Sequence, residues 1–119
     1  MNITKALKEA NERYYLMYQQ YTNEVDNLDI SVPYNSKTKT SNYTYLSFGW
    51  GGCYLMDITY VYCTMQTPWS EYVLYYSKYG ERQTCWAHKN DARSDRLCKS
   101  MTGKTSPSST TSTIAIYDF

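Results

Sequence analysis

The chain has 119 residues and a mass of 14.0 kDa, which suits a single domain with one hydrophobic core. Twelve Lys and Arg against eleven Asp and Glu give a formal net charge of +1, a balance that argues against a general polyanion-binding protein. Hydrophobic residues make up 42% of the chain, which excludes wholesale disorder, and 15 residues are tyrosine.

The N-terminal segment has no uninterrupted apolar core and no small-residue cleavage site, so it does not resemble a signal peptide. The longest mostly apolar stretch, residues 51–65, contains Asp57 and is too short to span a bilayer. We therefore expect a cytoplasmic protein with no membrane contact.

Residues 4–28 are predicted to form one long amphipathic helix, because apolar residues recur there every three or four positions. Thr4 or Asn2 can cap its N-terminus. The expected buried stripe is half tyrosine and consists of Leu7, Ala10, Tyr14, Met17, Tyr18, Tyr21, Val25 and Leu28. Residues 29–42 are polar and rich in turn formers, which predicts a connector.

Residues 43–88 are predicted to supply the sheet. A strand from Tyr43 to Phe48 meets the glycine-rich turn 49–52, and a long strand from Cys53 to Gln66 follows. Along that strand Tyr54, Met56, Ile58, Tyr60 and Tyr62 share one face, and Cys53, Leu55, Asp57, Thr59, Val61, Cys63 and Met65 share the other. Both faces are largely apolar, so we expect cover on both sides, at least in part.

Residues 67–79 allow two interpretations. Pro68 and Glu71 suit a helix start, whereas the β-formers of 70–77 can pair with 81–88 through a turn at Ser77–Gly80. The hairpin is favoured. A short helix is predicted at 91–101, a flexible Ser/Thr-rich loop at 102–113 and a last strand at 114–118.

Together these elements predict one α+β domain over residues 1–119. A long N-terminal amphipathic helix packs on an antiparallel sheet of four to five strands, with a short second helix.

The four cysteines, Cys53, Cys63, Cys85 and Cys98, permit two disulfides in three pairings. Without a secretion signal we expect reduced, buried thiols. Zinc is the sharper alternative, since Cys85 and His88 have a ligand-like spacing and Cys98 follows, with Cys63 or Cys53 as a fourth ligand. Only one close pair of ligands exists, so we expect no metal and no cofactor. Two glycosylation patterns, at Asn2 and Asn42, have no meaning outside the secretory path.

Catalytic groups are scarce. His88 is the only histidine, and on a strand Cys85 would point to the opposite face from it. Asp57 has no second carboxylate placed to complete an acid–base pair, and Gly103-Lys104-Thr105 lacks the earlier glycine of a phosphate-binding loop. We therefore expect no enzymatic activity.

Two binding functions are predicted instead. Tyrosine, tryptophan and arginine are enriched at protein interfaces, which favours a small module that covers a site on a larger protein. The expected contacts are Trp50, Tyr79, Arg82, Trp86, Arg93 and Arg96. Compact domains without catalytic parts are common among phage and mobile-element proteins that inhibit host defence, such as anti-CRISPR proteins, and the expected function is of that kind, in the host cytoplasm.

The alternative is single-stranded nucleic-acid binding. Residues 78–104 carry seven Lys or Arg against three Asp or Glu, together with aromatic residues. The backbone contacts would be Arg82, Arg93, Arg96, Lys99 and Lys104. A homodimer through the tyrosine stripe of the first helix, or through an uncovered sheet edge, is a third prediction.

Overall fold

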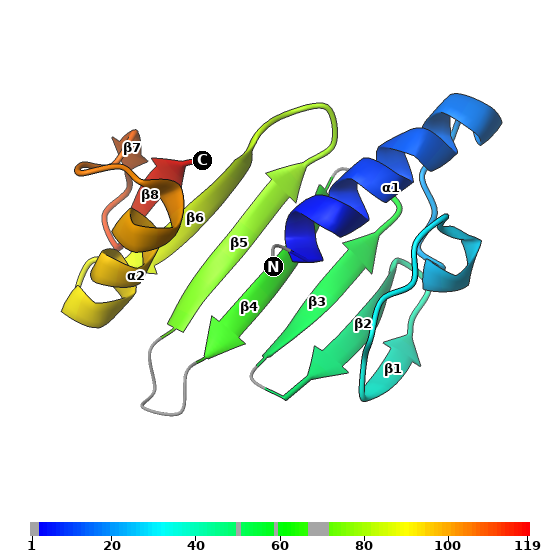
Figure 1. Ribbon diagram of the computed structural model, residues 1–119, viewed down its shortest axis with the longest axis horizontal. Helices are drawn as coiled ribbons and strands as arrows, with labels where there is room; N and C mark the ends of the chain where they lie inside the picture. Colours follow the sequence, from blue (N-terminus) through cyan, green and yellow to red (C-terminus); the bar gives the residue numbers. More distant parts are fainter. Residues whose placement is uncertain (1–2, 50, 59, 67–71) are drawn as a thin grey trace.

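The computed structural model describes residues 3–49, 51–58, 60–66 and 72–119. Within them two α-helices, α1 (Ile3–Tyr18) and α2 (Ala92–Thr102), and a short 3₁₀ helix, η1 (Val25–Asn27), accompany one eight-stranded sheet (Figure 1). The strands are β1 (Ser36–Lys39), β2 (Tyr43–Phe48), β3 (Gly51–Met56), β4 (Tyr60–Gln66), β5 (Tyr72–Lys78), β6 (Gln83–His88), β7 (Ser109–Thr110) and β8 (Ile114–Asp118). The predicted α+β fold class is confirmed, and the sheet is larger than the four or five strands expected.

The sheet is an antiparallel meander for most of its width. Its order is β1-β2-β3-β4-β5-β6-β8-β7, so the first six strands each lie beside their neighbours in sequence. After β6 the chain forms α2 and returns as β8, which pairs with β6, while the short β7 takes the outer edge.

Both α-helices cover the same face of the sheet (Figure 1). Across that face the register aligns Leu46 with Cys53 and Cys63 on one side, and Cys85 with Tyr117 on the other. All five residues are buried, and Leu7 and Ala10 of α1 join the same core. No helix covers the opposite face in the described part of the chain. On that second face the side chains of β3 and β4, such as Tyr54 and Tyr62, are half-buried.

The predicted helix 4–28 ends ten residues early, at Tyr18. Gln19 adopts a left-handed conformation (φ 60°), and its N–H donates to the Tyr15 carbonyl at 2.8 Å, which closes the last turn. The chain then folds back, and Val25 and Leu28 reach the core from η1 and the residue after it. The apolar residues Val25 and Leu28 beyond Tyr18 are thus buried from a 3₁₀ turn and not from a continued α-helix.

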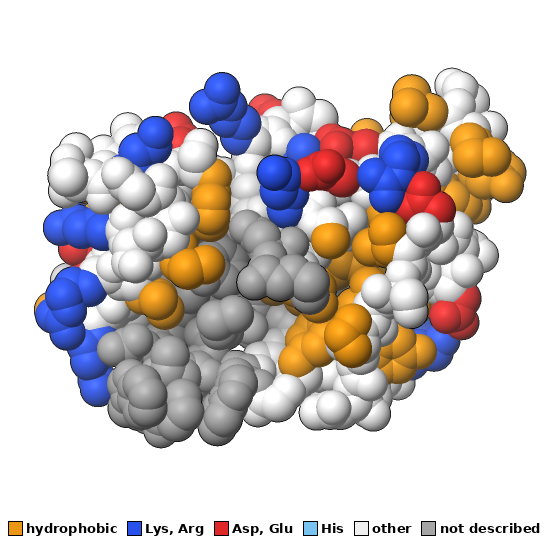
Figure 2. All heavy atoms as spheres, in the orientation of Figure 1, with side chains coloured by type: hydrophobic (Ala, Val, Ile, Leu, Met, Phe, Trp, Pro, Cys, Tyr) orange, Lys and Arg blue, Asp and Glu red, His pale blue; other side chains and the backbone are white. Residues whose placement is uncertain are grey.

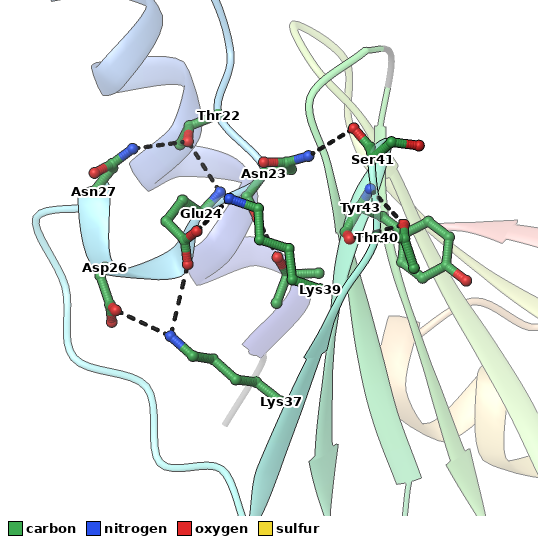
Figure 3. A network of polar contacts seen from close by, with 11 residues as sticks. Thr22, Asn23, Glu24, Asp26, Asn27, Lys37, Lys39, Thr40, Ser41 and Tyr43 are labelled. Atoms are coloured by element: carbon green, nitrogen blue, oxygen red, sulfur yellow. Dashed lines mark hydrogen bonds and ion pairs between the residues drawn. The ribbon is translucent and has the colours of Figure 1, made fainter.

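The predicted connector 29–42 contains the edge strand β1. Its two lysines reach the acidic segment around η1: Lys37 Nζ lies 3.0 Å from Asp26 Oδ2, and Lys39 bonds Glu24 (Figure 3). The hydrogen bond from Lys39, with the charges of both lysines, holds the pKa of Glu24 below its ordinary value. These contacts join segments more than ten residues apart, which local turn propensity does not register.

The predicted long strand Cys53–Gln66 is a hairpin of β3 and β4. Asp57, which interrupts the apolar pattern, lies in the connection between the two strands. Leu55 lies opposite Val61 and Cys53 opposite Cys63, so even-numbered residues still share one face and odd-numbered residues the other. The predicted division of side chains between the faces therefore holds for the described residues of both strands.

The β5–β6 hairpin confirms the favoured interpretation of the next segment, of which residues 67–71 lie outside the described chain. Ser77 pairs with Gln83, and Gly80 takes a positive φ of 81° in the turn. The helix predicted at 91–101 is α2, where Asp91 accepts from the N–H groups of Arg93 and Ser94 and Gly103 closes the end. The last strand, 114–118, is also confirmed, and the loop 102–113 holds the short β7.

The cysteines form two disulfides, Cys53–Cys63 and Cys85–Cys98, so the expectation of free thiols is wrong. The first bond crosses the β3–β4 hairpin, and the second fastens α2 to β6. Both lie on the helix-covered face, where their sulfur atoms are part of the hydrophobic core.

Candidate functional site

The sheet face without helices is lined by aromatic side chains. Tyr45 on β2 lies opposite Tyr54 on β3, and Tyr54 lies opposite Tyr62 on β4. Their ring centroids are 4.7 and 4.6 Å apart. Two more rings join this row, since Tyr43 lies 5.2 Å from Tyr54 and Tyr60 lies 5.8 Å from Tyr62. All five tyrosines are partly exposed to solvent.

Trp86 lies on the same side of the sheet, on β6. It lies opposite Ile116 on β8, and its indole N–H donates to Thr84 Oγ1 at 2.8 Å. We call these six residues the tyrosine face: Tyr43, Tyr45, Tyr54, Tyr60, Tyr62 and Trp86. Each keeps part of its surface accessible, so the face offers a broad surface of rings and hydroxyl groups.

A glycine on β3 makes room for the tyrosine face. A Cβ atom at Gly52 would overlap the ring of Tyr45, and Gly52 itself is buried. The ring of Tyr45 therefore lies against the backbone of the neighbouring strand, at a place where any other residue would displace it. The ring of Tyr45 thus packs over Gly52 as well as against Tyr54.

The six residues predicted to contact a protein do not form one surface. Trp86 belongs to the tyrosine face, whereas Arg93 and Arg96 are exposed on α2, which packs over the opposite face. Arg82 is exposed in the β5–β6 turn. Trp50 lies outside the described residues.

Tyr79 is a core residue, and its predicted place at the surface is wrong. It is 8% exposed; Asn11 Nδ2 of α1 donates to its hydroxyl at 2.6 Å, and that hydroxyl donates to the Met56 carbonyl. Its ring stacks on Tyr21 with centroids 4.0 Å apart. Burial raises the pKa of Tyr79 well above its ordinary value. Its turn position suggested exposure, but α1 and the segment after it cover this turn.

The cations of α2 proposed for nucleic-acid binding lie apart from the aromatic rings. Arg93, Arg96 and Lys99 belong to α2, on the helix-covered side, and Lys99 Nζ lies 3.0 Å from Asp95 Oδ2. Lys104 is exposed just beyond the helix. A single-strand groove needs cations along the path of the stacked bases. Here the sheet separates the cations of α2 from Trp86 and the tyrosines.

The candidate catalytic and metal-binding groups are also dispersed. His88 is exposed at the end of β6, while Cys85 is bonded to Cys98 and so offers neither a nucleophilic thiolate nor a metal ligand. Asp57 lies in the β3–β4 connection. Across the described ranges, no three side chains of His, Cys, Asp or Glu gather as a metal site would require.

The prediction of contacts missed the five tyrosines of the tyrosine face. The signal was present in the alternation, which put Tyr54, Tyr60 and Tyr62 together on one face. The alternation does not show that α1 and α2 both pack on the opposite face, which carries the two disulfides.

The chain matches no protein-family model, and neither a curated protein nor a solved structure is similar enough to indicate a relationship. In the ranges that the structure describes, neither helix has the length and apolar character needed to cross a membrane.

Proposed function

We propose that the protein is a small, non-catalytic protein-binding module whose contact surface is the tyrosine face. The observation that carries this proposal is the set of five tyrosines and one tryptophan on the helix-free face of the sheet. Tyrosine and tryptophan are enriched at protein interfaces, and charged residues are depleted from interface centres. The uncharged centre of the face is the row Tyr45, Tyr54 and Tyr62, and the exposed Lys78 of β5, which pairs with Tyr60, lies at its border.

The tyrosine face is ordered before binding, which supports the same proposal. Its five tyrosine rings lie 4.6 to 5.8 Å from one another along the row, and Gly52 accommodates Tyr45. On the other side of the same two strands, the Cys53–Cys63 disulfide joins β3 to β4. Side chains that are already ordered lose less conformational entropy when a partner binds, so more of the contact energy appears as affinity.

Single-stranded nucleic-acid binding is the second candidate, through Arg82, Arg93, Arg96, Lys99 and Lys104. The exposure of Arg93 and Arg96 on α2 favours it. Their separation from the aromatic rings favours the protein partner instead. A nucleic-acid complex would lose affinity steeply as the salt concentration rises, because salt cations compete with the protein's Lys and Arg side chains for the phosphates.

The predicted inhibitor of a host defence complex, of the anti-CRISPR kind, is one form of this proposal and belongs to a host cytoplasm. The two disulfides support a different compartment, because disulfides are rare in reducing cytosol and persist in oxidising surroundings. We therefore propose an oxidising compartment for the binding function, in place of the host cytoplasm that an anti-CRISPR inhibitor would need.

Site-specific photocrosslinking tests the contact surface. A photoreactive phenylalanine analogue replaces Tyr54 or Tyr62 on the tyrosine face, and Tyr34, an exposed tyrosine outside that face, is the matched control. Each variant is irradiated in an extract of its source, with and without nuclease. We expect one discrete protein adduct from positions 54 and 62 that survives nuclease, and none from position 34.

Two results would contradict the proposal. Adducts of equal yield from all three positions would mean that the tyrosine face is not selective, and no adduct from positions 54 and 62 would mean that it is not the contact surface. Adducts from positions 54 and 62 that disappear with nuclease would mean that nucleic acid, and not a protein, contacts the tyrosine face. The α2 alternative has its own test, because it predicts that Arg96→Glu loses oligonucleotide binding.

A further inference from the structure

The C-terminal turn of α1 exposes four consecutive apolar side chains. Leu16 and Met17 are 77% and 74% exposed, and Tyr18 and Tyr15 are 55% and 39% exposed. The helix extends past the edge of the region it covers, and hydrophobic side chains gather at that end of the molecule (Figures 1 and 2). We call Tyr15, Leu16, Met17 and Tyr18 the α1 tip.

This exposure is unusual for the residue types involved. A helical segment that is apolar on all sides is normally buried, and a contiguous apolar patch on a monomer marks an interaction site. Earlier in α1 the ordinary pattern holds, since Leu7 and Ala10 are buried against the sheet. The α1 tip therefore lacks the cover that its composition requires.

The α1 tip is held in place by ring contacts. Tyr15 stacks on Tyr21 with ring centroids 4.6 Å apart, and Tyr21 stacks on the buried Tyr79. Tyr18 lies 4.5 Å from Tyr14. The rings thus support a formed helix end that presents Leu16 and Met17 outward.

Charge indicates which partner suits the α1 tip. Ten consecutive residues, 14–23, carry no charged side chain. The flanking charges are already paired, Arg13 with Asp29 at 2.6 Å and Glu24 with Lys37 and Lys39. A strongly charged partner would find no complement here, whereas a second copy would meet an identical neutral, apolar surface without repulsion.

The sheet edges are weaker candidates for pairing two copies. The edge strand β1 has four residues, two of them lysines, and β7 at the other edge has two residues. Short and charged edge strands resist pairing with another chain.

We propose that the α1 tip is the interface of a homodimer, in which Leu16 and Met17 of the two copies pack against each other about a two-fold axis. With full side-chain areas of about 150–200 Å² each, the four exposed fractions offer roughly 400 Å² per copy. Two copies then bury at most about 800 Å², which is the size of a weak, reversible contact. The dimer therefore forms only at high protein concentration.

This interface is independent of the tyrosine face. Because α1 packs on the opposite side of the sheet, failure of either proposal leaves the other standing.

Sedimentation equilibrium of the full chain at about 10 μM to 1 mM tests the dimer. We expect the wild-type mass to rise from 14.0 kDa toward twice that value, and Leu16→Glu and Met17→Glu to remain at 14.0 kDa throughout. Met101→Glu is the matched control, because Met101 is 43% exposed in the last turn of α2, so it should associate like the wild type. Circular dichroism and urea unfolding confirm that each variant is folded.

Three outcomes would overturn the assignment. The wild type would stay at 14.0 kDa at 1 mM if another protein is the true occupant of the α1 tip. Association unchanged in both Leu16→Glu and Met17→Glu, or equally lost in Met101→Glu, would place the contact elsewhere. A mass that grows past the dimer would exclude a closed two-fold contact.

Discussion

Asn11 organises the end of α1 from a fully buried position. Its Oδ1 accepts from the Thr22 N–H at 2.9 Å, and its Nδ2 donates to the Thr22 carbonyl at 2.9 Å and to the Tyr79 hydroxyl at 2.6 Å. One amide side chain thus satisfies the backbone of the returning chain and the hydroxyl of a core tyrosine. It links three segments that meet only in the folded protein.

Asn11→Ala should lower the free energy of unfolding by about 2–4 kcal/mol, because the Thr22 amide and carbonyl lose buried partners. Urea unfolding followed by circular dichroism measures the change. Asn27→Ala is the control: its side chain is exposed and, among the described residues, makes one hydrogen bond, to Thr22 Oγ1, so the substitution should cost less than about 1 kcal/mol. Equal losses in the two variants would refute the role given to Asn11.

Among the elements, α2 is attached to the sheet at two points. The Cys85–Cys98 disulfide joins it to β6, and the Tyr117 hydroxyl of β8 donates to Asp95 Oδ1. Burial, together with that hydrogen bond and the charge of Asp95, raises the pKa of Tyr117 to about 12. The hydrogen bond from the same hydroxyl lowers the pKa of Asp95, and the hydrogen bond and charge of Lys99 lower it further.

This contact predicts alkaline sensitivity. In the unfolded chain Tyr117 ionises near its ordinary pKa of 10.0, so the stabilisation is complete below pH 10 and is lost as pH rises toward 12. Between pH 10 and pH 12 the unfolding free energy of Tyr117→Phe should therefore fall by about 2–3 kcal/mol less than that of the wild type. Urea unfolding at pH 9, 10, 11 and 12 measures it, with the exposed Tyr34→Phe as control. A Tyr117→Phe slope equal to that of the control would exclude this source.

Elements with strong local signals were predictable. Asp91 and Gly103 mark the two ends of α2, and the turn at Gly80 supports the β5–β6 hairpin. The alternation of side chains assigns the two faces of β3 and β4. The end of α1 was not predictable from local signals, because Asn11 forms hydrogen bonds with Thr22 and Tyr79, which lie 11 and 68 residues away in the sequence. β1 was missed because its lysines bond acids that precede it by 11 to 15 residues.

For the molecule as a whole, the number of free thiols indicates whether the protein folds in an oxidising or a reducing compartment. Alkylation in denaturant, without reductant, should add no groups to protein isolated from its source, and alkylation after reduction should add four. Intact-mass spectrometry reads both results. Four groups before reduction would restore the cytoplasmic location first predicted.

The candidate site was predictable only in part for a related reason. Alternation groups Tyr54, Tyr60 and Tyr62, and their β-propensity fits a strand surface, yet solvent access depends on where α1 and α2 pack. Tyr79 shows the converse, since a residue in a turn is buried when a distant helix covers it.

The meander order also bears on how the chain reaches this structure. Each of the first six strands finds its partner next in sequence, so contact order over that region is low and loop-closure entropy small. The cysteines follow the same plan: of the three pairings, the protein uses the one that joins nearest neighbours, 10 and 13 residues apart. Oxidation can therefore capture one hairpin and one helix–strand unit separately, before the sheet is complete, with little need for an isomerase to correct the pairing.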